Sequence, residues 1–120
     1  NGEILHMDSV RFQNNQAASL SAALFIDAAG NVTPAARLAN LLFSDNSLIS
    51  ADTEDAIVNI DGAFASLNVE MDHITAADNS ASTFLYAQPS HKPNTTLTVT
   101  VKNALISFFT NAYAAAETGD

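Results

Sequence analysis

The chain has 120 residues, no cysteine and a net charge of −9, and only 14% of its residues are charged. This length fits one domain, 1–120, with a single hydrophobic core. Four Lys and Arg stand against thirteen Asp and Glu, which excludes nucleic acid as an expected partner, because phosphates are bound by basic residues. No apolar stretch is long enough for membrane insertion, and the absence of cysteine rules out disulfides, thiolate metal ligands and cysteine nucleophiles.

The first part of the chain predicts a strand followed by a helix. The segment GEILHMDSVRF alternates imperfectly between apolar and polar residues, which indicates a strand. Over 16–29 apolar residues recur at helical spacing, Asn14 or Asn15 can cap the start, and Gly30 suits the position after a helix end. We therefore predict a helix over 16–29.

The next segments predict a second helix and a hairpin. Thr33 as N-cap and Pro34 in the first turn precede a stripe of leucines at 38, 41 and 42, which predicts a short helix. From Asp55 onward two interpretations remain. Asp61-Gly62 between apolar runs favours a hairpin, whereas the apolar spacing from 57 to 71 also fits a helix. We prefer the hairpin because a glycine inside a helix costs about 1 kcal/mol.

The C-terminal part predicts two strands and a final helix. TFLYAQ reads as a strand, and the prolines at 89 and 93 indicate a turn. Residues 95–101 alternate and are rich in β-branched side chains, which predicts the clearest strand of the chain. Asn103 can then cap a helix that contains Leu105, Phe108 and Phe109; the alternative is one strand that continues to Phe109. No internal repeat or linker is evident.

Together these elements predict an α+β fold, with a mostly antiparallel sheet and two or three helices packed on one face. The alternative is an all-β sandwich with short helices, which applies if 16–26 is extended.

The sequence carries no motif that specifies catalysis or metal binding. Glycines at 2, 30, 62 and 119 cannot form a phosphate-binding or dinucleotide-binding loop. His6 with Asp8, and Asp72 with His73, are residue types that bind zinc, but no ligand spacing joins them. We interpret these residues and His91 as surface groups. We thus predict no catalytic residue, no cofactor and no metal, and the chain is not expected to be an enzyme.

The aromatic residues predict a core and one contact surface. Phe108 and Phe109 are adjacent, so on a helix they lie about 100° apart and one faces outward. With Tyr113 nearby, Phe108, Phe109 and Tyr113 form the predicted assembly interface. The sequence therefore favours a non-enzymatic structural or assembly protein, such as a surface-filament, pilus-like or virion subunit, whose partner is itself or another protein through apolar contacts. Its expected location is extracellular, on the cell surface or in a virion.

The alternative function is a small ligand-binding module or small enzyme. It requires an apolar pocket between the sheet and the helices, in which a small molecule binds.

Overall fold

The computed structural model describes residues 4–27, 35–52, 54–62, 66–88, 94–107 and 109–115. These residues form eleven strands and no helix. The strands are β1 (Ile4–Asp8), β2 (Arg11–Gln13), β3 (Gln16–Ala17), β4 (Ser21–Asp27), β5 (Ala35–Ser44), β6 (Ser47–Leu48), β7 (Ala56–Asp61), β8 (Leu67–Ala77), β9 (Thr83–Gln88), β10 (Leu97–Ile106) and β11 (Asn111–Ala115).

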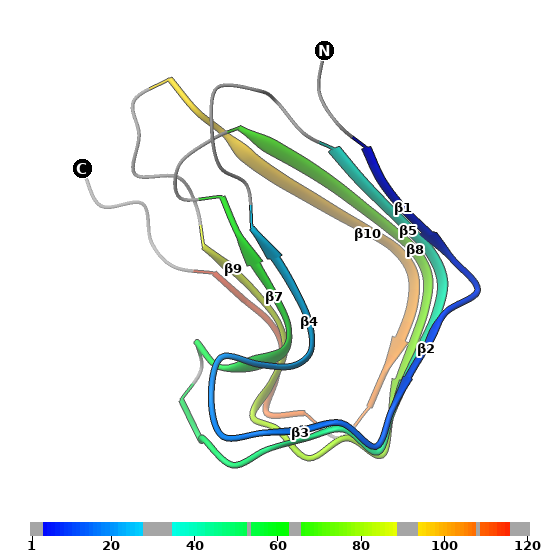
Figure 1. The fold of residues 1–120 in the computed structure, drawn as a ribbon, viewed down its shortest axis with the longest axis vertical. Coiled ribbons are helices and arrows are strands. Elements are labelled where there is room, and N and C mark those ends of the chain that lie inside the picture. Colours follow the sequence, from blue (N-terminus) through cyan, green and yellow to red (C-terminus); the bar gives the residue numbers. More distant parts are fainter. Residues whose placement is uncertain are drawn as a thin grey trace.

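The described strands pair only in parallel, and they form two facing sheets joined by a short base. The long sheet has the order β1-β5-β8-β10, with β2 also paired to β5. The short sheet has the order β4-β7-β9-β11. At the base β3 pairs with β6, and a bridge from Ser47 to Ser80 extends this pairing. Figure 1 shows the long and short sheets facing each other, with β3 at the base between them.

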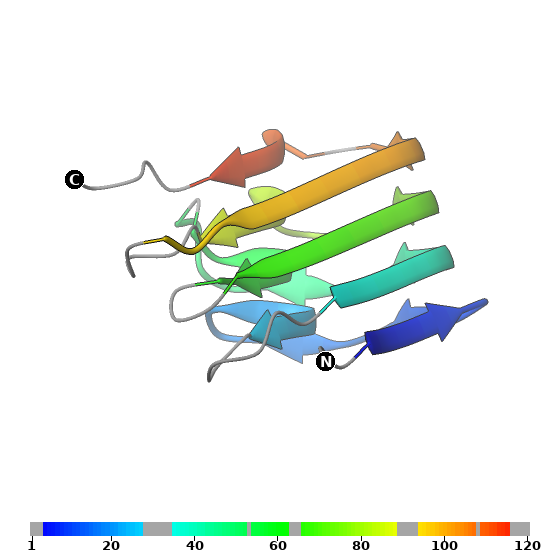
Figure 2. The same cartoon turned by 90° about the horizontal axis from the view of Figure 1, so that it is seen from above.

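The chain winds through these sheets as a β-solenoid of four coils. Coil 1 contains β1–β4, coil 2 contains β5–β7, coil 3 contains β8 and β9, and coil 4 contains β10 and β11. Ile4 pairs with Ala35, Ala35 with Asn68, and Asn68 with Thr98, so each turn of the solenoid takes about 30 residues. We call such a set of paired positions a row. Figure 2 shows the coils stacked in chain order, with coil 1 and coil 4 at opposite ends.

One left-handed residue in each coil bends the long sheet. Ser9, Asn40, His73 and Asn103 share a row and have φ between 51° and 59°. Asparagine tolerates this conformation better than most residues because its short side chain bonds locally. The bend places two successive side chains on the outer face, so the buried positions of β5 fall at 36, 38, 41 and 43.

The core lies between the sheets and is filled by apolar rows. Phe43 is fully buried; its ring stacks on Phe12 at a centroid distance of 4.9 Å and meets the edge of Phe84 at 5.3 Å. Phe109 continues this contact from Phe84 at 5.6 Å. Aromatic pairs in these arrangements stabilise a fold beyond the area that they bury. The aromatic contacts therefore tie all four coils together.

An asparagine ladder satisfies the polar backbone at the turn after the long sheet. Asn46 is fully buried and its Oδ1 accepts hydrogen bonds from the backbone N–H and side-chain Nδ2 of Asn15, at 3.2 and 2.8 Å. Asn79 makes the same contacts one coil later. Its Oδ1 accepts hydrogen bonds from the backbone N–H and the side-chain Nδ2 of Asn46, at 3.1 and 2.9 Å. The Nδ2 groups of Asn46 and Asn79 also donate to the carbonyls of Phe12 and Phe43. Buried polar groups are tolerated when they are bonded in this way.

The predicted fold class is wrong in both of its forms. The α+β fold with an antiparallel sheet fails because the described residues contain parallel sheets and no helix, and the sandwich with short helices fails for the same reason. The single strand predicted over 2–12 is confirmed as extended within the described residues, where it forms the two strands β1 and β2, while residues 2 and 3 lie outside them; the strand TFLYAQ is confirmed as β9.

The predicted helices correspond to strands. The segment 16–29 forms β3 and β4 up to Asp27, and the leucine stripe lies in β5, while Thr33 and Pro34 lie outside the described residues. The reason is the bend: it puts Leu38 and Leu41 on the same side of a strand three residues apart, which imitates helical spacing.

The predicted hairpin and C-terminal helix are also wrong. β7 and β8 lie in different sheets, so Asp61-Gly62 does not join a hairpin. Gly62 instead allows close packing, since a Cβ at this position would lie 3.1 Å from Leu97 Cβ. The strand predicted over 95–101 begins at Leu97 and continues through Asn103 to Ile106, where the helix was expected.

Candidate functional site

The two ends of the solenoid expose rows that are buried in its middle. One such row is Met7, Leu38, Met71 and Val101. Leu38 and Met71 in coils 2 and 3 are 1% exposed, whereas Met7 in coil 1 and Val101 in coil 4 are half-buried. The coil on each side covers a central residue, but an end residue has such a neighbour on one side only. This inward-facing row is therefore less covered at the two ends than in the middle of the described solenoid.

Exposed large apolar side chains gather in the same two coils. The structure exposes six of them among the described residues, and five lie in coils 1 and 4: Leu5, Leu20, Phe25, Leu105 and Tyr113. Single exposed apolar residues are ordinary on soluble proteins, but groups of them mark contact surfaces. The sixth, Ile49, lies in coil 2, and Leu105 faces the outer depression of the long sheet, so the end coils are enriched in exposed apolar side chains without forming one continuous patch.

The C-terminal end also contains an apolar cleft. Val99 and Val101 of β10 face Leu85, Ala87, Tyr113 and Ala114 of the short sheet across a volume of about 470 Å³. The cleft is thus the part of the space between the two sheets that lies at coil 4, where the described residues include no further coil to cover it.

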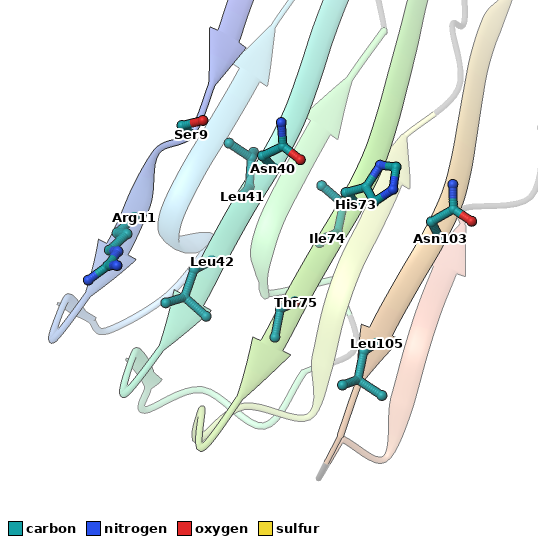
Figure 3. A pocket seen from close by; sticks show the side chains of 10 residues that line it. All are labelled: Ser9, Arg11, Asn40, Leu41, Leu42, His73, Ile74, Thr75, Asn103 and Leu105. Atoms are coloured by element: carbon teal, nitrogen blue, oxygen red, sulfur yellow. The ribbon is translucent and has the colours of Figure 1, made fainter.

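A second depression, of about 560 Å³, lies on the outer face of the long sheet at its bend. Figure 3 shows one row of mostly polar side chains, Ser9, Asn40, His73 and Asn103, and beside it a mixed row, Arg11, Leu42, Thr75 and Leu105. The side chains come from Ser9, which lies between β1 and β2, and from β2, β5, β8 and β10, and they lie along an open surface. This shape does not enclose a reactant or exclude water, as sites of catalysis do.

Two carboxylates beside this outer depression are held by asparagines of the next coil. Asn40 Nδ2 donates to Asp8 Oδ1 at 2.8 Å, and Asn103 Nδ2 donates to Asp72 Oδ1 at 2.8 Å. The bond from Asn40, with a further bond from Ser9, lowers the pKa of Asp8. The bond from Asn103 is the largest cause that lowers the pKa of Asp72, and nearby His73 contributes in the same direction. These bonds therefore favour the ionised form of both carboxylates.

We predict that Asn103→Ala raises the pKa of Asp72 toward its ordinary value of 3.8 and leaves that of Asp8 unchanged, while Asn40→Ala does the reverse. Side-chain carboxyl NMR titration measures both values. Because the folded pKa is the lower one, each bond stabilises the fold above the unfolded pKa, and this contribution disappears as the pH falls through the folded pKa. Equal responses of both carboxylates to either substitution would contradict this assignment.

The structure separates the histidines and carboxylates that resemble zinc ligands. His6 and Asp8 lie on β1 and Asp72 and His73 on β8, with β5 between the two strands. Within the described ranges no group of three or more His, Cys, Asp or Glu side chains can hold a metal ion. His91 lies outside the described residues.

The phenol of Tyr86, on β9, is buried. Burial raises the pKa of Tyr86, and Glu54 and Asp61 act in the same direction. The protonated Tyr86 hydroxyl donates to Gln88 Oε1 at 3.1 Å. Its part is therefore that of a fixed hydrogen-bond donor.

Two of the three predicted assembly residues, Phe109 and Tyr113, lie in coil 4, and the described part of that coil contains no helix. Tyr113 lies on β11 and is 52% exposed, while Phe109 is half-buried against Phe84. Phe108 lies outside the described residues. Sequence reasoning missed Val99, Val101 and the residues of coil 1. The sequence signal for these residues was a 2-3-2 spacing, in which successive apolar positions are two, three and two residues apart. This spacing identifies the rows only once the bend is known.

The alternative pocket between sheet and helices has no counterpart in the described residues, because they contain no helix. For the same reason, no described segment is a helix that could cross a bilayer. Comparison of the chain with protein-family models, curated proteins and solved structures gives no match.

Proposed function

We propose that this chain is a non-enzymatic structural or assembly module that binds protein through the apolar ends of its solenoid. Such a role suits a surface-filament, pilus-like or virion subunit, and hence a place outside the cell, on its surface or in a virion. The observation that carries the proposal is the contrast within single rows: Leu38 and Met71 are buried, while Met7 and Val101 at the ends are half-buried. A further protein layer on either end would bury these side chains as the central coils do.

The strand edges support the same role. In the described residues β1 and β4 pair on one side only at one end, and β10 and β11 do so at the other. An edge strand presents backbone N–H and C=O groups that can pair with another chain. Addition of a strand to such an edge is a standard mode of protein recognition, in which the backbone supplies affinity and the side chains supply specificity.

The proposal predicts concentration-dependent association of the purified chain. Light scattering over roughly 1 μM to 1 mM, the span in which weak protein contacts form, should show a mass that rises with concentration. Moderate salt should strengthen association, because each copy carries a net charge of −9 and salt screens the repulsion.

Substitutions at the C-terminal end test the site. Val101→Lys places a charge in the cleft and should weaken association at least about tenfold, or about 1.4 kcal/mol. Thr98→Lys is the matched control, since Thr98 is exposed on the same strand and the charge change is equal. Tyr113→Ser is a second variant at an exposed position, with circular dichroism as the check of folding. A chain that stays monomeric at every concentration tested would contradict the proposal.

A further inference from the structure

We propose that the protein bound at these ends is a second copy of this chain, docked head to tail, so that β10 of one copy pairs in parallel with β1 of the next. This inference rests on the proposed function and identifies its partner. It also fixes a register: Lys102 of one copy lies beside Asp8 of the next.

The solenoid already contains the geometry of this contact. Coil 1 and coil 4 lie at opposite ends of the stack (Figure 2), and each coil pairs with the next in parallel. A second copy placed on coil 4 by the same step brings its β1 beside β10 and its β4 beside β11. Contact between two like ends, with the outer faces aligned, would instead pair the strands antiparallel, so that the base of one copy would not lie over the base of the other. A head-to-tail contact of this kind is heterologous and can propagate into a filament.

The outer charges favour the head-to-tail arrangement. Asp8, Ala39, Asp72 and Lys102 form one row on the outer face. Continuing the row by one step places the exposed Lys102 next to the exposed Asp8 of the following copy, on strands about 4.8 Å apart. β10 carries no acidic residue, so a contact between two C-terminal ends offers Lys102 no carboxylate from that strand. The chain has only four Lys and Arg, and one of them occupies this position.

The apolar rows that face the core also continue across the proposed contact. The step that joins Lys102 to Asp8 also places Val101 beside Met7 and Ile106 beside Phe12 of the next copy. All four of these side chains are half-buried and belong to rows that are apolar throughout. The neighbouring copy would cover each of them with an apolar side chain, and the register brings no charged residue inward at these positions.

The absence of cysteine allows a direct test by engineered disulfides. Asp8→Cys and Lys102→Cys are prepared as separate full-length chains, one of them isotopically labelled, then mixed and oxidised. Directly opposed residues on neighbouring strands lie about 4.8 Å apart, within the Cα range of roughly 4.4–6.8 Å that a disulfide needs. Mass spectrometry should show the mixed dimer in at least tenfold excess over both like dimers, as expected if one register dominates.

The matched control mixes Asp8→Cys with Thr98→Cys. Thr98 is exposed on the same face of β10, but in the proposed register it lies opposite position 4 of the next copy and not position 8. This pair should give little disulfide. Efficient coupling to Thr98→Cys, or a predominance of like dimers in a chain that does associate, would overturn the head-to-tail register while leaving the proposed function intact. Absence of any association of the wild-type chain would overturn both.

Charge reversal gives a second readout that needs no covalent bond. Lys102→Glu should weaken association up to about fivefold, the range of a cross-strand ion pair, and Asp8→Lys in the same chain should restore it to within about twofold of the wild type. Failure of the double variant to recover, with both variants folded by circular dichroism, would show that Lys102 and Asp8 do not meet.

Discussion

Phe43→Ala is expected to lower the free energy of unfolding by about 3–5 kcal/mol. The Phe43 ring is fully buried, stacks on Phe12 and meets the edge of Phe84, so its removal leaves a cavity between coils 1, 2 and 3. Since domains of this size are stable by about 5–15 kcal/mol, the loss is a large part of the total. Urea denaturation, followed by circular dichroism, measures it.

Phe25→Ala is the matched control for Phe43→Ala. Phe25 is 46% exposed on the edge strand β4, so its truncation removes the same ring at much smaller cost. Equal losses for the two variants would show that the aromatic contacts of Phe43 do not hold the coils together.

Asn46→Asp is the second substitution with a large expected effect, a loss of about 3–5 kcal/mol at neutral pH. Asn46 Nδ2 donates to the Phe12 carbonyl and to Asn79 Oδ1, and a carboxylate would turn both donor bonds into contacts between acceptors. Asn46 is fully buried, so the new charge has no solvent to relieve it. Asn68→Asp, on the exposed face of β8, is the control and should change stability little.

The deficit of Asn46→Asp should depend on pH in a defined direction. Burial raises the pKa of the new carboxyl in the folded state above its unfolded value of about 3.9. The variant is therefore closest to the wild type below the unfolded pKa and loses stability as the pH rises through the folded pKa. Urea denaturation of the wild type and both variants between pH 4 and 8, approximately the interval over which a buried carboxyl titrates, measures the difference. A loss of unfolding free energy that does not change over this pH range would show that burial does not raise the pKa of the new carboxyl.

The sequence does contain the repeat of this fold. It is visible as a recurring spacing of apolar positions, and not as a recurrence of the same residue types. Apolar positions fall in a 2-3-2 spacing around the left-handed residue at each bend of the long sheet, at 36, 38, 41 and 43 in coil 2 and at 69, 71, 74 and 76 in coil 3. The side chains differ from coil to coil; Phe43, for instance, is followed by Ala76 in its row. A row requires only that its side chains be apolar and pack against one another, so the residue type can differ from coil to coil.

The site was predictable only in part. The sequence predicted an exposed apolar side chain near Tyr113, because too few charged residues accompany the aromatic side chains there, and Tyr113 is exposed; that it contacts another protein stays a proposal. The greater exposure of Val101 did not follow from the sequence, because Val101 and Met71 are equivalent by pattern and differ only in having one described coil or two beside them. Which residues lie at an end depends on the order in which the coils stack.

The sequence alone determined the acidic, cysteine-free character of the chain, its lack of phosphate-binding motifs and the presence of strands at β1 and β9. Only the tertiary structure decided that the strands pair in parallel across about 30 residues and that the bends at Asn40 and His73 produce the apparent helical spacing. The physical reason is that the hydrogen bonds of a strand are made with a neighbour distant in the chain, whereas those of a helix are local. Local pattern therefore shows which side chains are apolar, but not which neighbouring coil covers them.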